Sequence, residues 1–293
     1  MKQVFALVVA FVCSTSFAQS KPLKIFISAD MEGVAGVSTW DVQANAKARE
    51  YEEFRNLMTQ EVNAAVEGAY DAGATEVVVA DSHGDAQNID IALLDKRAEL
   101  IRAWPRPLGM MEGIDNSFAA VVFIGYHAAE GTPGAVLAHT FTGSMAVKLN
   151  GTDEPEAGFN AAIAGDFGVP VVFVSGDQVI GEQSRNLFGN IETVAVKQAI
   201  GYHAAKMMAP QKAQALIRAG VTKAIQRRAE LKPYRVSQPV KMEVRFHDAI
   251  EAEVVSYFPQ TQRTDGNTIV FTAKDMTEAS RFLEAIDNIA IRP

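Results

Sequence analysis

Residues 23–33 read LKIFISADMEG, a short and mostly apolar run followed directly by two carboxylates, Asp30 and Glu32. A run of this length and composition is typical of a buried strand. Three further runs of the same kind follow, and they read TEVVVA (75–80), AAVVFI (119–124) and VVFVS (171–175). Strands that are apolar throughout and alternate with helices are typical of an α/β fold. We therefore expect a mainly parallel sheet that is covered by helices on both faces.

The segments between these runs show apolar residues at helical spacing. The expected helices cover residues 50–72, 156–167, 179–187 and 208–230. Further strands are expected at 99–103 and at 145–149, where Asn150-Gly151 predicts a hairpin turn. Beyond Lys232-Pro233 the expected elements are a strand (240–246), a helix (249–257), a strand (268–272) and a helix (276–289). We expect an α/β domain over residues 19–205 and a smaller C-terminal α+β subdomain over residues 206–293.

Residues 1–18 have the three parts of a secretory signal peptide. Lys2 supplies a positive charge, residues 4–12 form an apolar run, and Ser16-Phe17-Ala18 has the small-x-small form of a cleavage site. The apolar run is too short for a permanent transmembrane helix, so no stable membrane anchor is expected. The alternative is a buried N-terminal strand. We expect cleavage after Ala18 and a secreted, periplasmic protein.

Composition excludes several classes of protein. The hydrophobic fraction of 48% is too high for a disordered chain, and the net charge of -8 argues against binding to nucleic acid. The one cysteine, Cys13, lies in the expected leader, so the mature chain would have no thiol for catalysis or for a disulfide. Gly33 and Gly36 alone do not form a phosphate-binding loop after the first strand.

Candidate ligands for a metal ion follow three of the expected strands. Asp30 and Glu32 follow the first strand, His83 follows the second, and His127 follows the third. Parallel sheets bind ions and small molecules at the carboxyl ends of their strands, and these ends meet at one edge of the sheet. Carboxylates together with imidazoles are a typical ligand set for zinc and related metals. The sequence therefore indicates a metal site at this edge.

Each of these residues has a simpler explanation when it is taken alone. An aspartate at a strand end often caps a helix or stabilises a turn, and a single histidine is more often structural than a ligand. Asp81 shares a strand face with His83 and could either bind the metal or orient that histidine from behind. His203 and His247 lie away from the strand ends, and we expect them to be structural.

Three more residues are candidates because of their positions. His139 follows the Gly- and Pro-containing loop 131–134 and could reach the same edge of the sheet. Glu156 lies at a helix start, where a carboxylate is also favoured by the helix dipole alone. Asp177 is a weak candidate for binding the ammonium group of a substrate, because a role as a turn residue explains it better.

Taken together, these motifs resemble the DppA-type zinc-dependent D-aminopeptidase family. The resemblance covers nearly the whole mature chain in the same order. Its motifs are Asp30-Met31-Glu32-Gly33, Asp81-Ser82-His83, Gly125-Tyr126-His127-Ala128, Thr132-Pro133-Gly134 with His139, Glu156 to Ala161, Ser175-Gly176-Asp177, Ala195 to Gln198 and Phe271 to Met276. The domain over residues 19–205 would then be the catalytic, metal-binding one.

The resemblance implies two Zn²⁺ ions per subunit. In this family's arrangement Asp30 would bridge both metals, Glu32 and His83 would complete one site, and His127 and Glu156 the other. Charge balance agrees, because two dications and one bridging hydroxide together neutralise three carboxylates. The resemblance also implies a ring-like homo-oligomer, specifically a homodecamer.

The implied activity is hydrolysis of short peptides with an N-terminal D-amino acid, D-Ala peptides above all. A metal-bridged hydroxide would attack the scissile carbonyl, and His139 would act as the catalytic histidine, either by stabilising the oxyanion or by moving a proton. Two alternatives stay open at this point. One is a zinc hydrolase of L-peptides or other small amides, and the other is a periplasmic peptide-binding protein without catalysis.

Overall fold

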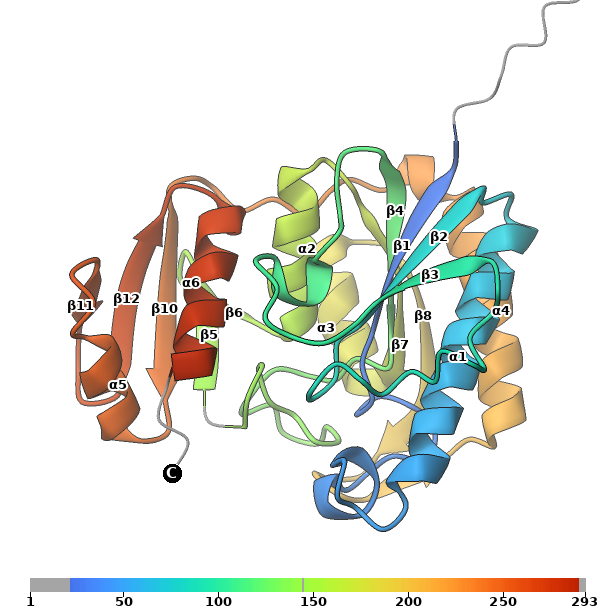
Figure 1. The fold of residues 1–293 in the computed structure, drawn as a ribbon, viewed down its shortest axis with the longest axis horizontal. Helices are drawn as coiled ribbons and strands as arrows, with labels where there is room; N and C mark the ends of the chain where they lie inside the picture. The colour runs from blue at the N-terminus through green and yellow to red at the C-terminus, as the bar shows by residue number, and fades with distance from the viewer. Residues whose placement is uncertain (1–21, 144, 290–293) are drawn as a thin grey trace, which may run out of the picture.

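The computed structural model describes residues 22–143 and 145–289, so the expected signal peptide lies outside the described residues. Two sheets form the framework (Figure 1). The larger one has seven strands in the order β3-β2-β1-β4-β7-β8-β9. Their bounds are β1 (Lys24–Ala29), β2 (Glu76–Asp81), β3 (Ala98–Ile101), β4 (Phe118–Ile124), β7 (Val171–Asp177), β8 (Glu192–Ala199) and β9 (Ala205–Met207). The predicted α/β class with a mainly parallel sheet is confirmed.

The register of the large sheet brings the strand ends together. β1 runs parallel to β2 and β4 on its two sides, and Ala29 at its end lies opposite Asp81 and Ile124. β7 and β8 continue the parallel order, and β9 pairs with β8 in the antiparallel direction. The residues that follow β1, β2 and β4 therefore leave the sheet side by side at one edge.

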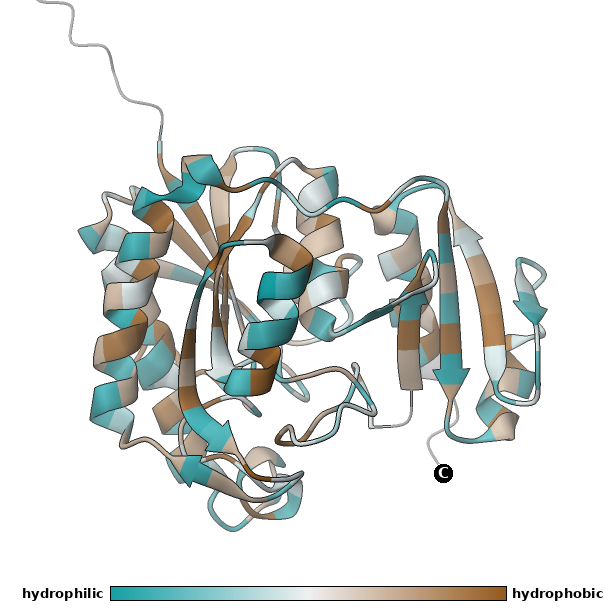
Figure 2. Cartoon of the chain, turned by 180° about the vertical axis from the view of Figure 1, so that it is seen from behind, coloured by the Kyte–Doolittle hydropathy of each residue, from teal (hydrophilic) through white to brown (hydrophobic). Residues whose placement is uncertain are grey.

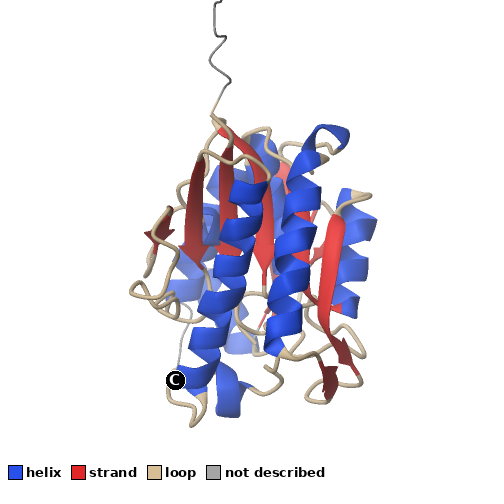
Figure 3. Ribbon diagram, turned by 90° about the vertical axis from the view of Figure 1, so that its right-hand side faces the viewer, coloured by secondary structure: helices blue, strands red, loops and turns tan. Residues whose placement is uncertain are grey.

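Helices cover both faces of the large sheet. One face packs against α1 (Tyr51–Asp71) and α4 (Pro210–Gln226), which lie side by side in front of the strands in Figure 3. The other face packs against α2 (Glu156–Asp166) and α3 (Gln178–Phe188). The central strands are mostly brown in Figure 2, whereas the helices alternate between brown and teal. This pattern is expected for strands that are buried on both faces.

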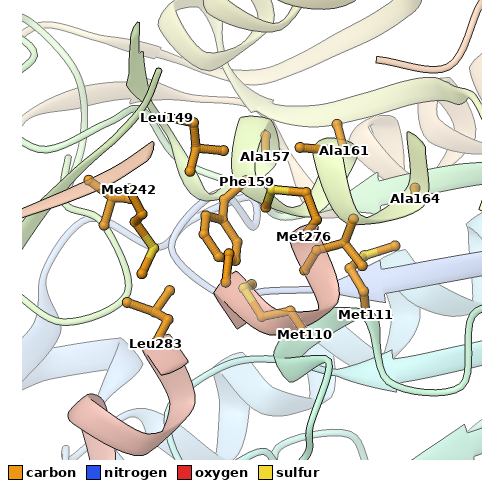
Figure 4. Packing of buried hydrophobic residues seen from close by; sticks show 14 of the residues in the cluster. Met110, Met111, Leu149, Ala157, Phe159, Ala161, Ala164, Met242, Met276 and Leu283 are labelled. Atoms are coloured by element: carbon orange, nitrogen blue, oxygen red, sulfur yellow. The ribbon is translucent and has the colours of Figure 1, made fainter. Parts of the chain in front are cut away.

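A second, antiparallel sheet has the order β11-β12-β10-β5-β6. Its strands are β5 (Met145–Leu149), β6 (Thr152–Glu154), β10 (Val240–Phe246), β11 (Thr261–Arg263) and β12 (Thr268–Ala273), and its helices are α5 (Ala249–Val255) and α6 (Met276–Ile289). The core is continuous between the two sheets. Phe159 of α2 lies among Met242, Met276 and Leu283 of this unit (Figure 4). One extended core thus holds the second sheet beside α2.

The expected division of the chain at residue 205 needs correction. The expected C-terminal subdomain includes α4. In the structure, the apolar side of α4 instead packs against the large sheet, in the same core as α1. Gly68 of α1 permits this close approach, because a Cβ there would overlap the backbone of Arg218. The hairpin formed by β5 and β6, assigned to the first domain, instead pairs with β10. The second unit is therefore discontinuous and combines residues 145–154 with the chain from residue 240 onward.

Short helices complete the described chain: a π-helix η1 (Trp40–Ala44) and two 3-10 helices, η2 (Gly109–Met111) and η3 (Arg228–Glu230). Within residues 22–143 and 145–289, none of the helices combines the length and the apolar character that crossing a membrane requires.

Candidate metal centre

The five predicted ligands converge at the edge where β1, β2 and β4 end. Each is at most 3% exposed. Asp30 directly follows β1, His83 lies two residues beyond β2, and His127 lies three residues beyond β4. Glu32 lies on the turn after β1, and Glu156 is the first residue of α2. Three strand ends and the start of one helix, distant in sequence, thus bring three carboxylates and two imidazoles to one buried place.

The two oxygens of Asp30 face two different histidines. Its Oδ1 lies 3.1 Å from Nδ1 of His83, which is also 3.0 Å from Oε2 of Glu32. Its Oδ2 lies 3.3 Å from Nε2 of His127, which is also 3.3 Å from Oε1 of Glu156. Asp30 therefore stands between a Glu32–His83 pair and a His127–Glu156 pair, which is the position a bridging carboxylate requires.

Two glycines allow the ligand-bearing turns to approach each other this closely. The N–H of Gly33 donates to the carbonyl of Gly125 at 2.7 Å, and the N–H of Asp30 donates to that of Ile124 at 2.8 Å. A Cβ at Gly33 would overlap the backbone of Gly125 and Tyr126, and a Cβ at Gly125 would overlap the carbonyl of Asp30. Gly125 also has a φ of 71°, in the region that favours glycine.

Hydrogen bonds to the backbone orient each imidazole. Nε2 of His83 donates to the carbonyl of Ala44 in η1 at 2.7 Å, which leaves Nδ1 to face the carboxylates of Asp30 and Glu32. Nδ1 of His127 lies 3.1 Å from the carbonyl of Ala128, which leaves Nε2 to face Asp30 and Glu156. A hydrogen bond of this kind on the far nitrogen is the usual device that fixes a metal-binding histidine.

Asp81 acts on the turn after β2, and among the described residues its carboxylate has no hydrogen bond or ion pair with a predicted ligand side chain. Its carboxylate accepts hydrogen bonds from the backbone N–H groups of Asn88 and Ile89 at 2.6 and 2.7 Å, and from Nδ2 of Asn88 at 2.8 Å. The same Asn88 amide donates to the carbonyl of His83 at 2.6 Å. Of the two roles left open for Asp81, the geometry therefore favours positioning of His83 from behind.

The ligand atoms fit a zinc site in two respects. Oδ2 of Asp30 and Nε2 of His127 are buried and have no hydrogen-bond partner among the described residues, although they face each other. Two ligands of a tetrahedral zinc with ordinary bond lengths lie about 3.3 Å apart. The observed nitrogen–oxygen distances of 3.0 to 3.3 Å match this spacing. Asp30, Glu32 and His127 also form one of the two clusters of potential metal ligands among the described residues.

The pKa values of these groups are shifted because carboxylates and imidazoles are buried close together. Burial raises the pKa of Asp30, and the neighbouring Glu32 carboxylate adds to the rise. Burial acts on Glu32 in the same direction, but the facing His83 outweighs it and holds the pKa of Glu32 well below its usual value. Burial lowers the pKa of His83 and of His127, yet the carboxylates around them raise both pKa values well above the ordinary value. Protons on the imidazoles thus supply the charge that a metal ion would otherwise bring.

His139 reaches the same edge but lies farther from the carboxylates. Its Nδ1 donates to the carbonyl of Leu137 at 2.7 Å, and its ring stacks on that of His127 with centroids 3.9 Å apart. Its Nε2 is 3.7 Å from Oε1 of Glu156 and 4.0 Å from Oε1 of Glu32. These distances exceed the spacing of zinc ligands, although His139 forms the second cluster of potential ligands with His127 and Glu156. The geometry therefore favours a role beside the metal site rather than as a ligand.

The contacts of Asp177, a weak candidate for substrate binding, favour a structural role. Its carboxylate caps α3 by accepting hydrogen bonds from the N–H groups of Val179 and Ile180, and it accepts another from Val136 at 2.9 Å. The predicted structural roles of His203 and His247 agree with their contacts. Both are exposed, and they bond to the Ser38 carbonyl and the Glu130 carboxylate respectively.

Sequence reasoning missed two buried charges beside the centre, Lys197 on β8 and Glu61 on α1. The Nζ of Lys197 donates to three backbone carbonyls of the turn that carries Glu32. Glu61 accepts from the N–H of Ala35 on the same turn. Two features of the sequence could have indicated these buried charges. One is a lysine within the partly apolar stretch AVKQA (195–199), and the other is a glutamate on the apolar side of a predicted helix.

A cavity of about 900 Å³ opens beside the ligands and is lined by both structural units. Four of the predicted ligands line it, as does His139. Trp40, Trp104 and Tyr202 contribute aromatic surface, and Glu251 and Glu284 belong to α5 and α6. Its size is that of a pocket for a small molecule or a short peptide.

Comparisons with known proteins match nearly the whole chain. A model of the family Peptidase_M55, described as D-aminopeptidase, matches residues 23–285. A D-aminopeptidase of Bacillus subtilis (strain 168) is 34% identical over 271 residues, which are 92% of this chain and 98% of that protein. The solved structure of the Zn-dependent D-aminopeptidase DppA from Bacillus subtilis, called a self-compartmentalizing protease, matches with a TM-score of 0.89 at 33% identity and covers 92% of this chain and 99% of that one. The resemblance predicted from short motifs is thereby confirmed.

Proposed function

Because the chain belongs to the D-aminopeptidase family Peptidase_M55, we propose that it is a zinc-dependent D-aminopeptidase with two zinc ions per chain. One observation carries the dinuclear part of the proposal: the two oxygens of Asp30 face two separate pairs of ligands. Glu32 and His83 would hold one ion, and His127 and Glu156 the other. Oxygen and nitrogen ligands without sulfur suit zinc at a catalytic site.

When bound, the zinc ions would lower the pKa of a coordinated water and polarise the scissile carbonyl. The chain itself supplies the proton transfer. Since Nδ1–H of His139 is held by the Leu137 carbonyl, its Nε2 is free to accept a proton beside the ligands and to pass it to the leaving amine. The ring of His127 stacks on His139 and keeps that nitrogen aimed at the reacting groups.

The cavity favours the amino end of a short peptide. Apart from the proposed ligands, its acidic lining includes Asp85, Glu251 and Glu284, and no lysine or arginine lines it among the described residues. A protonated α-amine is attracted to such a surface. D-Ala peptides, including cell-wall fragments, are the substrates that we propose.

We also propose where the mature protein is located and how its subunits assemble. Removal of residues 1–18 would place the mature enzyme in the periplasm, in agreement with the three-part leader pattern. A ring-like homo-oligomer, with the decamer as the specific expectation, is supported by the description of the Bacillus subtilis structure as self-compartmentalizing.

The proposal is tested with the purified mature chain by elemental analysis and a matched panel of D-Ala-D-Ala and L-Ala-L-Ala. We expect bound zinc, hydrolysis of the D-dipeptide in preference to the L-dipeptide, and loss of hydrolysis when the metal is removed. Preference for the L-dipeptide would favour the alternative zinc hydrolase of L-peptides. Zinc binding without any hydrolysis, or hydrolysis that does not depend on metal, would contradict the proposed activity.

A further inference from the structure

Lys197 is a buried cation whose hydrogen bonds all go to one turn. It lies on β8 and is 2% exposed. Its Nζ donates to the carbonyl oxygens of Glu32 at 2.5 Å, Val34 at 2.9 Å and Val37 at 2.6 Å. An ammonium group has three N–H donors, so this set of acceptors uses all of them. The carbonyls of residues 32–37 thus form a cage that is filled by a cation from a distant strand.

Glu61 holds the same turn from its other side. It lies on α1, is 1% exposed, and accepts a hydrogen bond at 2.9 Å from the N–H of Ala35. Its carboxylate also attracts the Lys197 ammonium. Residues 32–37 are therefore fixed through their carbonyls by a lysine and through an N–H by a glutamate, and Glu32 lies at the beginning of this segment.

We propose that Lys197 is a positioning residue for the metal centre, whose ammonium group closes the carbonyl cage of residues 32–37 and thereby aims Glu32 at its metal. This inference rests on the proposed zinc function. Without the ammonium, three buried carbonyls would lose their donor, and the turn would have to open toward water or rearrange. Glu32 would move with it.

The geometry predicts that loss of the Lys197 ammonium affects one of the two proposed zinc sites more than the other. Glu32 pairs with His83, whereas among the described residues no hydrogen bond or ion pair joins residues 33–37 to the side chains of His127 or Glu156. Loss of the ammonium should therefore weaken the zinc site formed with Glu32 and His83 and spare the other one. A lysine that merely stabilised the fold would affect both sites together or neither.

The test uses Lys197→Ala, with Lys206→Ala as the matched control, because Lys206 is exposed on the neighbouring strand β9 and pairs with Gln198. Zinc affinity is measured by competition with a chromogenic chelator, and amide hydrogen exchange is measured on the zinc-free proteins. We expect one of the two zinc ions to bind Lys197→Ala about 10- to 100-fold more weakly, and amides within residues 33–37 to exchange faster. The control should match the wild type in both measurements.

Chemical rescue adds a readout that a purely structural role would not give. Propylammonium is the part of the lysine side chain that the alanine variant lacks. It should restore zinc affinity and amide protection in Lys197→Ala, whereas propanol, which is neutral and of similar size, should not. If the alanine variant fails to fold, Lys197→Met, which keeps most of the side-chain length but has no ammonium group, is used for the same two measurements.

Two zinc ions bound with wild-type affinity in the folded Lys197 variants, or unchanged exchange of residues 33–37, would overturn the inference. Equal weakening of both zinc ions would overturn it as well. Failure of the proposed function is distinguishable, because it would show as absent zinc in the wild type, and the exchange experiment on zinc-free protein would still decide whether Lys197 holds the turn.

Discussion

Replacement of Asp30 by asparagine tests whether this carboxylate joins two metals. The substitution keeps the shape of the side chain, and its amide oxygen can still accept the hydrogen bond that Oδ1 receives from the N–H of Met31 at 2.8 Å. It removes the negative charge that faces His83 at 3.1 Å and His127 at 3.3 Å. Asp30→Asn should therefore fold but bind both zinc ions weakly.

The size of the effect follows from mass action. With free zinc a thousandfold above the dissociation constant, each bound ion stabilises the fold by about 4.1 kcal/mol. A hundredfold weaker site at the same zinc concentration contributes only about 1.4 kcal/mol, a loss of about 2.7 kcal/mol. Because Asp30 faces both ligand pairs, its replacement should remove about 5 kcal/mol of zinc-dependent stabilisation, or roughly 10 °C in melting temperature.

Two controls make the comparison specific. Glu32→Gln changes the carboxylate that contacts His83, and Glu156→Gln changes the one that contacts His127. Each should remove about half of the effect, about 2.7 kcal/mol, and leave one tightly bound zinc ion. The assay is thermal unfolding with and without zinc, together with zinc titration. If Asp30→Asn kept one zinc ion at wild-type affinity, Asp30 would belong to a single site and the bridging argument would be refuted.

Three further predictions follow from the same geometry. His139→Ala should keep both zinc ions, since its Nε2 lies beyond ligand spacing, but should lower kcat by about 10²- to 10⁴-fold; zinc loss by elemental analysis would make His139 a ligand instead. Burial raises the pKa of Glu284 from 4.5 to about 7, so its contribution to stability falls as pH rises through that window, and Glu284→Gln should be more stable than the wild type at pH 8 by up to about 3 kcal/mol; equal urea midpoints at pH 8 would contradict this. Chelation of the wild type should abolish hydrolysis and lower the melting temperature, and added zinc should restore both; activity that survives complete chelation would argue against a metal-dependent mechanism.

The strands that carry the site were predictable because they are buried on both faces. Such strands are continuous apolar runs, and parallel order brings the residues after them to one edge. Asp30, His83 and His127 were found by this rule alone. Glu156 and His139 were weaker candidates, because a helix start and a loop position do not indicate which edge they approach.

Other parts were not predictable, for identifiable reasons. β8 reads ETVAVKQA and has mixed burial, so it shows no continuous apolar run, and Lys197 on it gives no local sign of the distant carbonyls it binds. α4 has an apolar side that predicts burial but not its partner, so it was placed in the wrong unit. The alternation of side chains along a strand predicts that Asp81 and His83 share a face. β2 ends at Asp81, however, so His83 lies on the following turn, where it faces the carboxylates while Asp81 binds the turn itself.

Anomalous diffraction at the zinc edge, on crystals of the zinc-loaded mature chain, is the most direct test of a centre built on Asp30. We expect two peaks per chain, one beside Glu32 and His83 and the other beside His127 and Glu156, with one oxygen of Asp30 directed at each. A single peak, or two peaks of which only one contacts Asp30, would contradict the bridged dinuclear site.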